Sequence, residues 1–366
     1  MSLWTTMTGF LKPAQSQYIA EPLVAARVDR ALGSTPAEAE RHYFRFKVAQ
    51  MFLRDKAKVL QTWYPAVHSV IQCSFGTNTI ELPNVADTTR LLAQPTATGD
   101  IVAKNFLLAP LLPFKGGAVR LAAGLFAVQG QNQLKDFVGV MSGFAKLLAV
   151  PQISAVLNVA GPLADGVQAL VGGGGLHLGY HDSFVAAGGS GNLLLPGYIA
   201  VVRSNDQALR QRLLVVNDEL WEGASLVDPK RKPFTAEDFM LLHIEVRETR
   251  DDFNELASIA KPYEEAIKAL GAKEYERADT QIRLALTNAL TADELTKADR
   301  RRVVDSLKAD YELAKAALAA QGLVEVADHN LQRQMDAAAR AVSVQRAIDM
   351  GEPTWREILD ISAIED

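Results

Sequence analysis

Two histidines and an aspartate stand close together in the chain and could take part in metal or acid–base chemistry. His177, His181 and Asp182 fall in the stretch Leu176–Val185, whose pattern predicts a strand. On a strand, at roughly 3.3 Å per residue, the two histidines share a face but lie about 13 Å apart. One metal ion cannot bridge that separation, so we predict no metal site. A pairing of His181 with Asp182 for hydrolysis stays open as an alternative.

The glycine run Gly172–Gly175 is the nearest approach to a phosphate-binding loop. A nucleotide loop follows a strand and opens a helix, so that N–H groups at the helix start face the phosphate. Here the run follows an expected helix and precedes an expected strand, and it lacks the Gly-Lys-Ser/Thr ending. We therefore expect a plain connection, no cofactor and no small-molecule substrate.

The single cysteine, Cys73, could act as a nucleophile, but its place in an alternating pattern favours burial. Ile71, Cys73 and Phe75 fall on one side of a predicted strand, where a small apolar residue is expected. No carboxylates are paired at a spacing typical of catalysis, so we predict no catalytic residue. A lone cysteine cannot form an internal disulfide, which favours a reducing compartment such as the cytoplasm.

Two sets of residues are candidates for binding a partner. Glu245 and Arg247 fall on one side of a predicted strand and could form a cross-strand ion-pair ladder or a polar partner face. The second set is an apolar stripe at helical spacings, flanked by Lys135 and Lys146, which could dock a membrane or a partner helix. Its members are Phe137, Val138, Met141, Phe144, Leu147 and Leu148. The alternative for this stripe is packing against a sheet.

The elements that position these residues follow from the hydrophobic pattern. A short helix is expected at Glu21–Ala31, and alternation with a period of two then predicts about eight strands before residue 250. These begin at Tyr43 and lie further on at Val67–Phe75, Ile80–Leu82, Phe106–Leu112, Ala118–Gln129, Leu176–Val185, Leu193–Val202 and Phe239–Glu248. A helical period predicts a pair of apolar helices at about 133–171, inserted among the strands.

Beyond Asp252 the pattern becomes helical and highly charged. Expected helices lie at Phe253–Leu270, Ala272–Leu290, from a capping box at Thr291 to Glu294 as far as Gln321, and at about His329–Met350. Long helices with short joints are typical of a bundle. The chain therefore reads as α+β: an N-terminal antiparallel β-sandwich-like domain at 1–250, carrying the inserted apolar helical segment, and a C-terminal α-helical bundle at 251–366.

The sign of the net charge also differs between the N-terminal and C-terminal parts of the chain. Residues 1–204 hold 16 basic and 11 acidic side chains, whereas residues 205–366 hold 22 and 32. The net charge of −5 gives no general attraction to nucleic acid. The charge-free run Leu147–Ala164 is about long enough to span a bilayer, but prolines and a glycine interrupt it, so we expect no constitutive membrane span.

These observations favour a non-enzymatic, cytoplasmic interaction or scaffold protein that binds one or more proteins in a larger assembly. One alternative is a latent membrane-acting effector, in which the acidic helical domain masks the apolar middle segment and membrane contact is conditional. A second alternative is an unrecognised hydrolase that uses His181 and Asp182.

Overall fold

The structure of the chain is a computed structural model that describes residues 3–11, 18–53, 63–75, 78–85, 101–129 and 175–322. Its contacts divide the chain into one compact unit, Met1–Tyr311, and a second, Glu312–Asp366, of which only the end of one helix is described. The expected apolar helices at 133–171, the apolar stripe from Phe137 to Leu148 and the helix expected at His329–Met350 lie outside the described residues.

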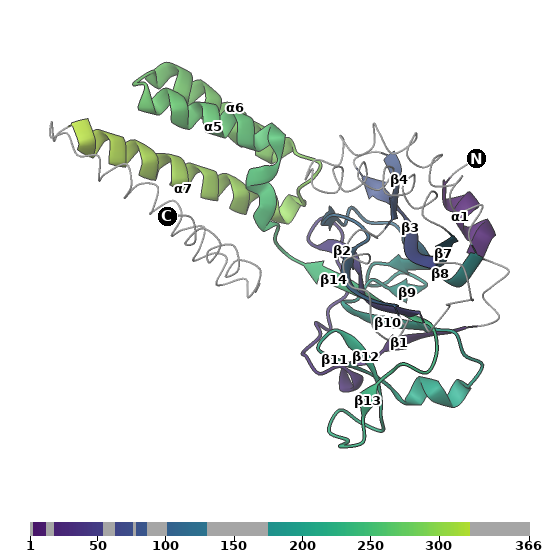
Figure 1. Cartoon of the computed structure of the whole chain (residues 1–366). Helices are drawn as coiled ribbons and strands as arrows, with labels where there is room; N and C mark the ends of the chain where they lie inside the picture. The colour runs from purple at the N-terminus through teal and green to yellow at the C-terminus, as the bar shows by residue number, and fades with distance from the viewer. Residues whose placement is uncertain are drawn as a thin grey trace. The chain divides into compact units, whose positions relative to one another are not determined.

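A large antiparallel sheet forms the centre of the first unit (Figure 1). Its strands in order are β1 (Ile19–Leu23), β10 (Gly197–Val202), β14 (Phe239–Arg247), β2 (Tyr43–Leu53) and β5 (Ile101–Leu107), with β6 (Leu112–Pro113) also pairing with β2. Strands that are neighbours in space are thus far apart in the sequence, and β2 lies beside β14.

A second, five-stranded sheet contains the longest strands. Its order is β4 (Asn78–Val85), β3 (Trp63–Phe75), β7 (Val119–Gln129), β8 (Gly175–Val185) and β9 (Asn192–Leu193), and only β9 runs parallel to its neighbour. A third, small sheet comprises β11 (Leu213–Val216), β12 (Glu219–Glu222) and β13 (Lys232–Pro233). Asn217 and Asp218 join β11 to β12 with φ of 52° and 63°, the positive values that a tight two-residue hairpin requires.

The two larger sheets share one hydrophobic core. The Phe46 ring of β2 lies 5.7 Å from the Phe184 ring of β8, and Ile71 and Leu121 are fully buried in the same cluster. The opposite face of the large sheet buries a separate cluster against the small sheet, where Phe239 belongs to the same cluster as Leu220 of β12. Both faces of the large sheet are therefore partly covered, which explains the nearly continuous burial along β2 and along the first half of β14.

Helix α1 (Leu3–Leu11) lies against the second sheet, on β8, β3 and β7. Leu11 is fully buried there, and a Cβ added at Gly179 would come within 2.6 Å of its Cδ2 atom. Only a residue without a side chain leaves room for this close approach.

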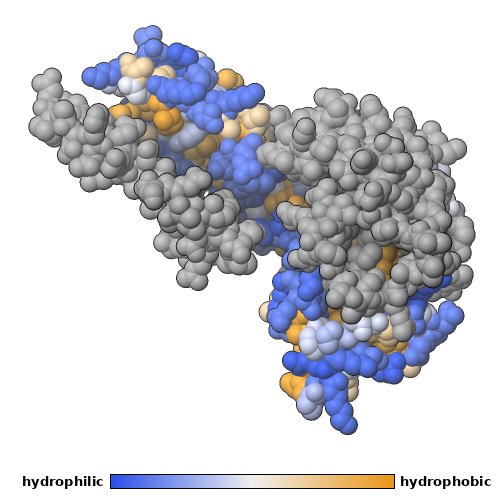
Figure 2. Space-filling model, viewed as in Figure 1, coloured by the Kyte–Doolittle hydropathy of each residue, from blue (hydrophilic) through white to orange (hydrophobic). Residues whose placement is uncertain are grey.

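Three helices follow the sheets: α5 (Ala257–Gly271), α6 (Tyr275–Thr291) and α7 (Lys297–Gly322), preceded by the short 3-10 helix η4 (Asp251–Glu255). Small buried residues, Ala266 and Ala269 of α5 and Ala278 and Ala285 of α6, fall on the inner faces of the first two helices. On the face drawn in Figure 2, this helical region is mostly hydrophilic with scattered apolar residues. Among the described residues, no helix is both long and apolar enough to cross a bilayer.

The mixed α+β class with a C-terminal helical region is confirmed, and that region contains three helices among the described residues. The helix expected at Glu21–Ala31 is wrong: Ile19–Leu23 is an edge strand paired with β10, and only Ala25–Arg27 forms a helical turn. Pro22 favours this outcome, because it supplies no N–H and is tolerated at a sheet edge. The small sheet was not expected from the sequence.

The capping box expected at Thr291 is also wrong, since Thr291 ends α6 and its hydroxyl donates back to the Thr287 carbonyl oxygen at 3.0 Å. Helix α7 begins six residues later, at Lys297, and its described part reaches Gly322, so the expected stop at Gly322 stays a prediction. The domain boundary after residue 250 stays a prediction, although the contacts place residues up to Tyr311 in one unit.

Candidate functional site

The residues proposed for a hydrolase lie on β8, where Asp182 is held by hydrogen bonds. Its carboxylate accepts from the Tyr180 hydroxyl at 2.9 Å, from the Ser183 N–H at 2.7 Å and from the Asn192 side-chain amide at 2.8 Å. His181 is the adjacent residue on the strand, so alternation directs its side chain to the other face of the sheet. These bonds link Asp182 to its neighbours and to the end of β9, as expected of a structural carboxylate.

Cys73 lies in the shared core, 3% exposed, on the face that the alternation predicts. Burial raises the pKa of its thiol to about 12. A thiol with this pKa stays protonated at neutral pH and is a poor nucleophile. Among the described residues, no group of three or more histidine, cysteine, aspartate or glutamate side chains is placed to hold a metal ion.

Glu245 and Arg247 lie together on β14, in a cluster that extends to β2. The Glu245 carboxylate binds Arg45 Nη2 at 2.7 Å and Lys47 Nζ at 2.9 Å, and its second oxygen accepts from the Arg247 guanidinium. Glu245 stands directly opposite Arg45 in the register of the two strands. The cross-strand ion-pair ladder proposed from the sequence is therefore present. We call these four residues, Arg45, Lys47, Glu245 and Arg247, the basic strip.

The cations of the basic strip control the charge of Glu245. Burial on its own would raise the pKa of this carboxyl, but the charges of Arg45 and Lys47, and then of Arg247, outweigh it and lower the pKa to about 2. Glu245 is thus ionised at any pH near neutrality. Three cations, those of Arg45, Lys47 and Arg247, thus surround this carboxylate.

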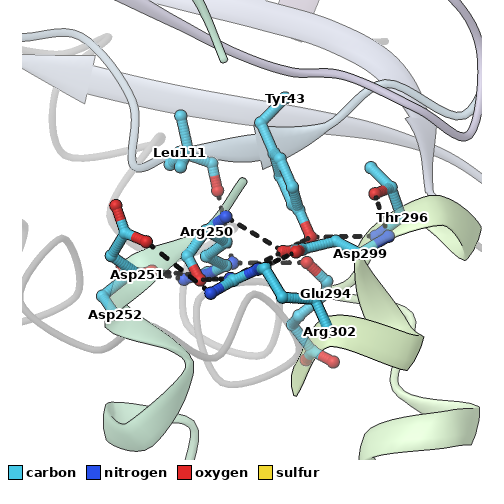
Figure 3. A network of polar contacts seen from close by, with 9 residues as sticks. All are labelled: Tyr43, Leu111, Arg250, Asp251, Asp252, Glu294, Thr296, Asp299 and Arg302. Carbon is cyan, nitrogen blue, oxygen red and sulfur yellow. Dashed lines mark hydrogen bonds and ion pairs between the residues drawn. The ribbon is translucent and has the colours of Figure 1, made fainter. Parts of the chain in front are cut away.

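Next to the strip, a buried polar cluster joins the large sheet to the helical region (Figure 3). We call it the junction network. The sheet region contributes Tyr43 of β2 and Leu111, which directly precedes β6. Arg250, Asp251 and Asp252 follow β14, Glu294 and Thr296 directly precede α7, and Asp299 and Arg302 lie in its first two turns.

Asp299 is the centre of the junction network, and its side chain is fully buried. Its Oδ2 atom accepts from the Tyr43 hydroxyl and from the Arg250 backbone N–H, each at 2.9 Å. Its Oδ1 atom accepts from Arg302 Nε at 2.5 Å. Burial, and then the Asp299 charge, raise the pKa of Tyr43, so that the phenol keeps the proton it donates.

Arg250 is fully buried, an unusual position for an arginine. Its Nε binds Asp252 Oδ1 at 2.6 Å and its Nη2 binds Oδ2 at 3.2 Å, which makes a two-pronged ion pair. Its Nη1 points to the carbonyl oxygens of Leu111 and Glu294, at 3.4 Å each. One side chain thus contacts backbone from the sheet region and from the start of α7.

Thr296 caps α7, because its hydroxyl accepts from the Asp299 N–H at 3.3 Å. Its own N–H donates to the Tyr43 hydroxyl at 3.0 Å. A second set of contacts lies beside this cap: Lys115 Nζ binds Glu40 Oε2 at 3.2 Å and the Leu295 carbonyl oxygen at 2.8 Å. The start of α7 is therefore held from three segments of the sheet region.

The sequence pattern did not identify the junction network. Its members come from separate segments, and each one alone resembles an ordinary surface residue. One local signal existed: Thr296 and Asp299 have the spacing of a helix cap, three residues apart, just before a helical run. The sequence pattern instead favours a cap at Thr291, which has Glu294 three residues further on.

Comparisons of the chain with protein-family models, with curated protein sequences and with solved structures found no significant match.

Proposed function

We propose that this protein is a non-enzymatic, cytoplasmic interaction or scaffold protein that binds one or more proteins within a larger assembly. The observation that supports this proposal is the junction network, in which Asp299 and Arg250 hold the start of α7 on the large sheet. The buried, protonated thiol of Cys73 fits a protein that keeps its cysteine reduced.

A buried ionic network is an expensive way to gain stability. Removing charges from water costs several kcal/mol per ion, and apolar residues of the same size often stabilise a fold as well or better. Directional hydrogen bonds add a defined geometry, because Arg250, Asp299 and Arg302 can form all of their hydrogen bonds to one another in only one arrangement. A scaffold needs this property, since it has to present two surfaces at a fixed distance and angle.

We also infer the finer architecture that such a scaffold would use. The two larger sheets, which share a core, would form a β-sandwich, and α5, α6 and α7 would form a bundle that presents a separate binding surface. The predicted division after residue 250 would then separate two binding parts that the junction network joins.

Affinity purification of the tagged full-length chain from its source cells tests the proposal. Three forms are compared: the wild type, Asp299→Ala, which removes the centre of the junction, and Asp305→Ala, an exposed acid of the same helix. We expect one soluble partner at a constant ratio with the wild type and with Asp305→Ala, and a reduced ratio with Asp299→Ala. Recovery of the wild-type chain alone, in both soluble and membrane fractions, would contradict the proposal.

One observation favours the latent membrane-acting effector as a second candidate. The segment that holds Phe137 and Phe144 leaves the sheet at the end of β7 and returns at the start of β8, and Ala127 pairs directly with Gly175. Its two attachment points are thus neighbours in one sheet. A segment attached in this way can change its surroundings without pulling the rest of the sheet apart.

Release of a trapped dye from anionic liposomes tests the second candidate. The full-length chain should release little dye as purified and much more after limited proteolysis within the acidic helical region. Phe144→Asp should abolish the release, whereas Leu284→Asp, at an exposed apolar position on α6, should leave it unchanged. If no dye is released either before or after proteolysis, the membrane-acting function is contradicted.

A further inference from the structure

We propose that helix α1 occupies, within this chain, the docking site for a longer amphipathic helix of a partner protein. This inference rests on the proposed function, because it names the surface and the kind of segment by which a scaffold would recognise its partner. The site lies on the second sheet, where α1 is packed.

The site is built on a row of residues that runs across three neighbouring strands. His68 of β3 stands opposite Gly124 of β7, which in turn stands opposite Gly179 of β8. Helix α1 lies against all three strands (Figure 1). We call these three residues the α1 row.

Two side chains of α1, one helical turn apart, anchor the helix at the two ends of the row. Met7 is 2% exposed, and its sulfur lies 3.1 Å from Nδ1 of His68. Since this sulfur carries no hydrogen, the ring nitrogen is the donor. Leu11 is fully buried at Gly179, where a side chain on the strand would collide with it. Anchors at positions i and i+4 are typical of a helix that docks on an apolar surface.

The length of α1 suits a segment that can leave its site. Helix α1 has nine residues, and a helix shorter than about 12 residues is marginal on its own in water. Docking therefore supplies most of its stability. Met7 and Leu11 are buried, whereas Thr5 and Gly9 are exposed. A short segment held through a few buried side chains opens locally more readily than the long strands beneath it.

The histidine beneath α1 links docking to pH. Burial lowers the pKa of His68 to about 4, and no charged group contributes to this shift. Leu3–Leu11 contains no ionisable side chain, and the cross-strand neighbours of His68, Val85 and Gly124, have none either. When α1 leaves, the ring returns to water and to its ordinary pKa of 6.5. Protonation of the open site therefore opposes docking.

The chemistry of α1 indicates what the partner helix presents. A methionine four residues before a leucine matches the row, and the docking face carries no charge. A second copy of this chain would bring only an identical α1, so an exchange between copies gains no contact. A partner helix of about 15 residues or more keeps the two anchors and forms more readily as a helix. It can therefore displace α1.

A fluorescein-labelled peptide is the probe, and fluorescence anisotropy with the full-length chain is the measurement. The peptide has the sequence of Leu3–Leu11 followed by two Ala-Ala-Lys-Ala-Ala blocks, which lengthen the helix. Met7→Asp/Leu11→Asp prevents the chain from filling its own site. We expect this variant to bind the peptide about tenfold more tightly than the wild type, whose own α1 competes. The same peptide with aspartate at both anchor positions should not bind.

Two further substitutions, each added to Met7→Asp/Leu11→Asp, test the row itself. Gly179→Val should abolish binding, whereas Gly271→Val, where a Cβ meets nothing within 4 Å, is the matched control and should not change it. Without either substitution, binding should weaken about tenfold between pH 7.5 and pH 5.5, because protonation of the open site begins near pH 6.5. His68→Leu should remove this pH dependence. Thermal unfolding of each variant, followed by circular dichroism, verifies that the chain is folded in the assay.

Three results would overturn the inference: no peptide binding by Met7→Asp/Leu11→Asp, binding that Gly179→Val leaves unchanged, or a pH dependence that survives His68→Leu. A wild-type dimer that becomes monomeric in Met7→Asp/Leu11→Asp, measured by light scattering, would overturn it too and assign the row to a second copy. A cellular partner that co-purifies equally with the wild type and with Gly179→Val would overturn this inference but leave the proposed function standing.

Discussion

The carboxylate of Asp299 accepts a hydrogen bond from the hydroxyl of Tyr43 at 2.9 Å, although 256 residues separate the two in the chain. The same hydroxyl accepts from the Thr296 N–H at 3.0 Å. One phenol of β2 thus contacts both the cap and the first acidic residue of α7. This small group of atoms is one of the links that attach the start of α7 to the sheet region.

Asp299→Ala should destabilise the protein strongly. It removes the acceptor for Tyr43, the Arg250 backbone and Arg302, and it leaves buried donors without a partner. We expect a loss of about 3–5 kcal/mol in the free energy of unfolding, measured by urea denaturation. Asp305→Ala, whose side chain is 64% exposed, should change it by less than about 0.5 kcal/mol. Equal effects from the two variants would contradict the central role of Asp299.

Thr296→Ala should cost about 0.5–2 kcal/mol, because it removes the side-chain acceptor at the start of α7. Thr296→Ser keeps that oxygen and should restore most of the loss. Thr291→Ala is the informative comparison, since Thr291 is exposed at the end of α6 and caps nothing. A larger loss for Thr291→Ala than for Thr296→Ala would place the cap where the sequence pattern first suggested it.

Glu245 should make the free energy of unfolding depend on pH in the acidic range. Its pKa in the folded chain is about 2, below the ordinary value of 4.5, so its ionised form stabilises the fold above about pH 4.5. That contribution is lost as the pH falls from about 4.5 toward 2, and it amounts to at most about 3 kcal/mol. We expect the difference in unfolding free energy between the wild type and Glu245→Gln to shrink over this range. A difference that stays constant with pH would rule out the ion-pair cluster as its cause.

Cys73 should report unfolding of the shared core. Its thiol is buried and its pKa is raised to about 12, so it should react with a disulfide reagent at neutral pH only when the core opens. The labelling rate should rise with denaturant in step with the loss of circular dichroism. Rapid labelling of the native chain, as fast as in denaturant, would show that the thiol is accessible.

Local patterns in the sequence predicted much of the β-structure. Alternation placed strands on β2, β3, β7 and β8, and it set Cys73 on the inner face and Glu245 beside Arg247. These predictions succeed because a strand with one buried face needs a period of two, and that requirement is met within a few residues. The short strands of the small sheet lack such a run and were missed.

Pairing between distant segments could not be predicted in the same way. Nothing in the sequence around Tyr43 indicates that Asp299 lies above it, or that Arg45 stands opposite Glu245. These contacts follow from the order of strands in the large sheet, where β2 lies between β14 and β5. Local propensity does not encode that order. The sequence therefore identifies only Glu245 and Arg247 of the basic strip, and it does not identify the junction network.

The order of strands in the large sheet also bears on how the chain acquires its fold during synthesis. β2 has left the ribosome long before β14, its main neighbour, has been translated, so one side of a buried strand has no partner during that time. The contacts of Tyr43 with Thr296 and Asp299 form later still. Such non-local pairing slows folding and exposes apolar strands to aggregation. Nascent chains that stop before residue 239 should therefore depend on chaperones, whereas chains that reach the start of α7 can complete the large sheet.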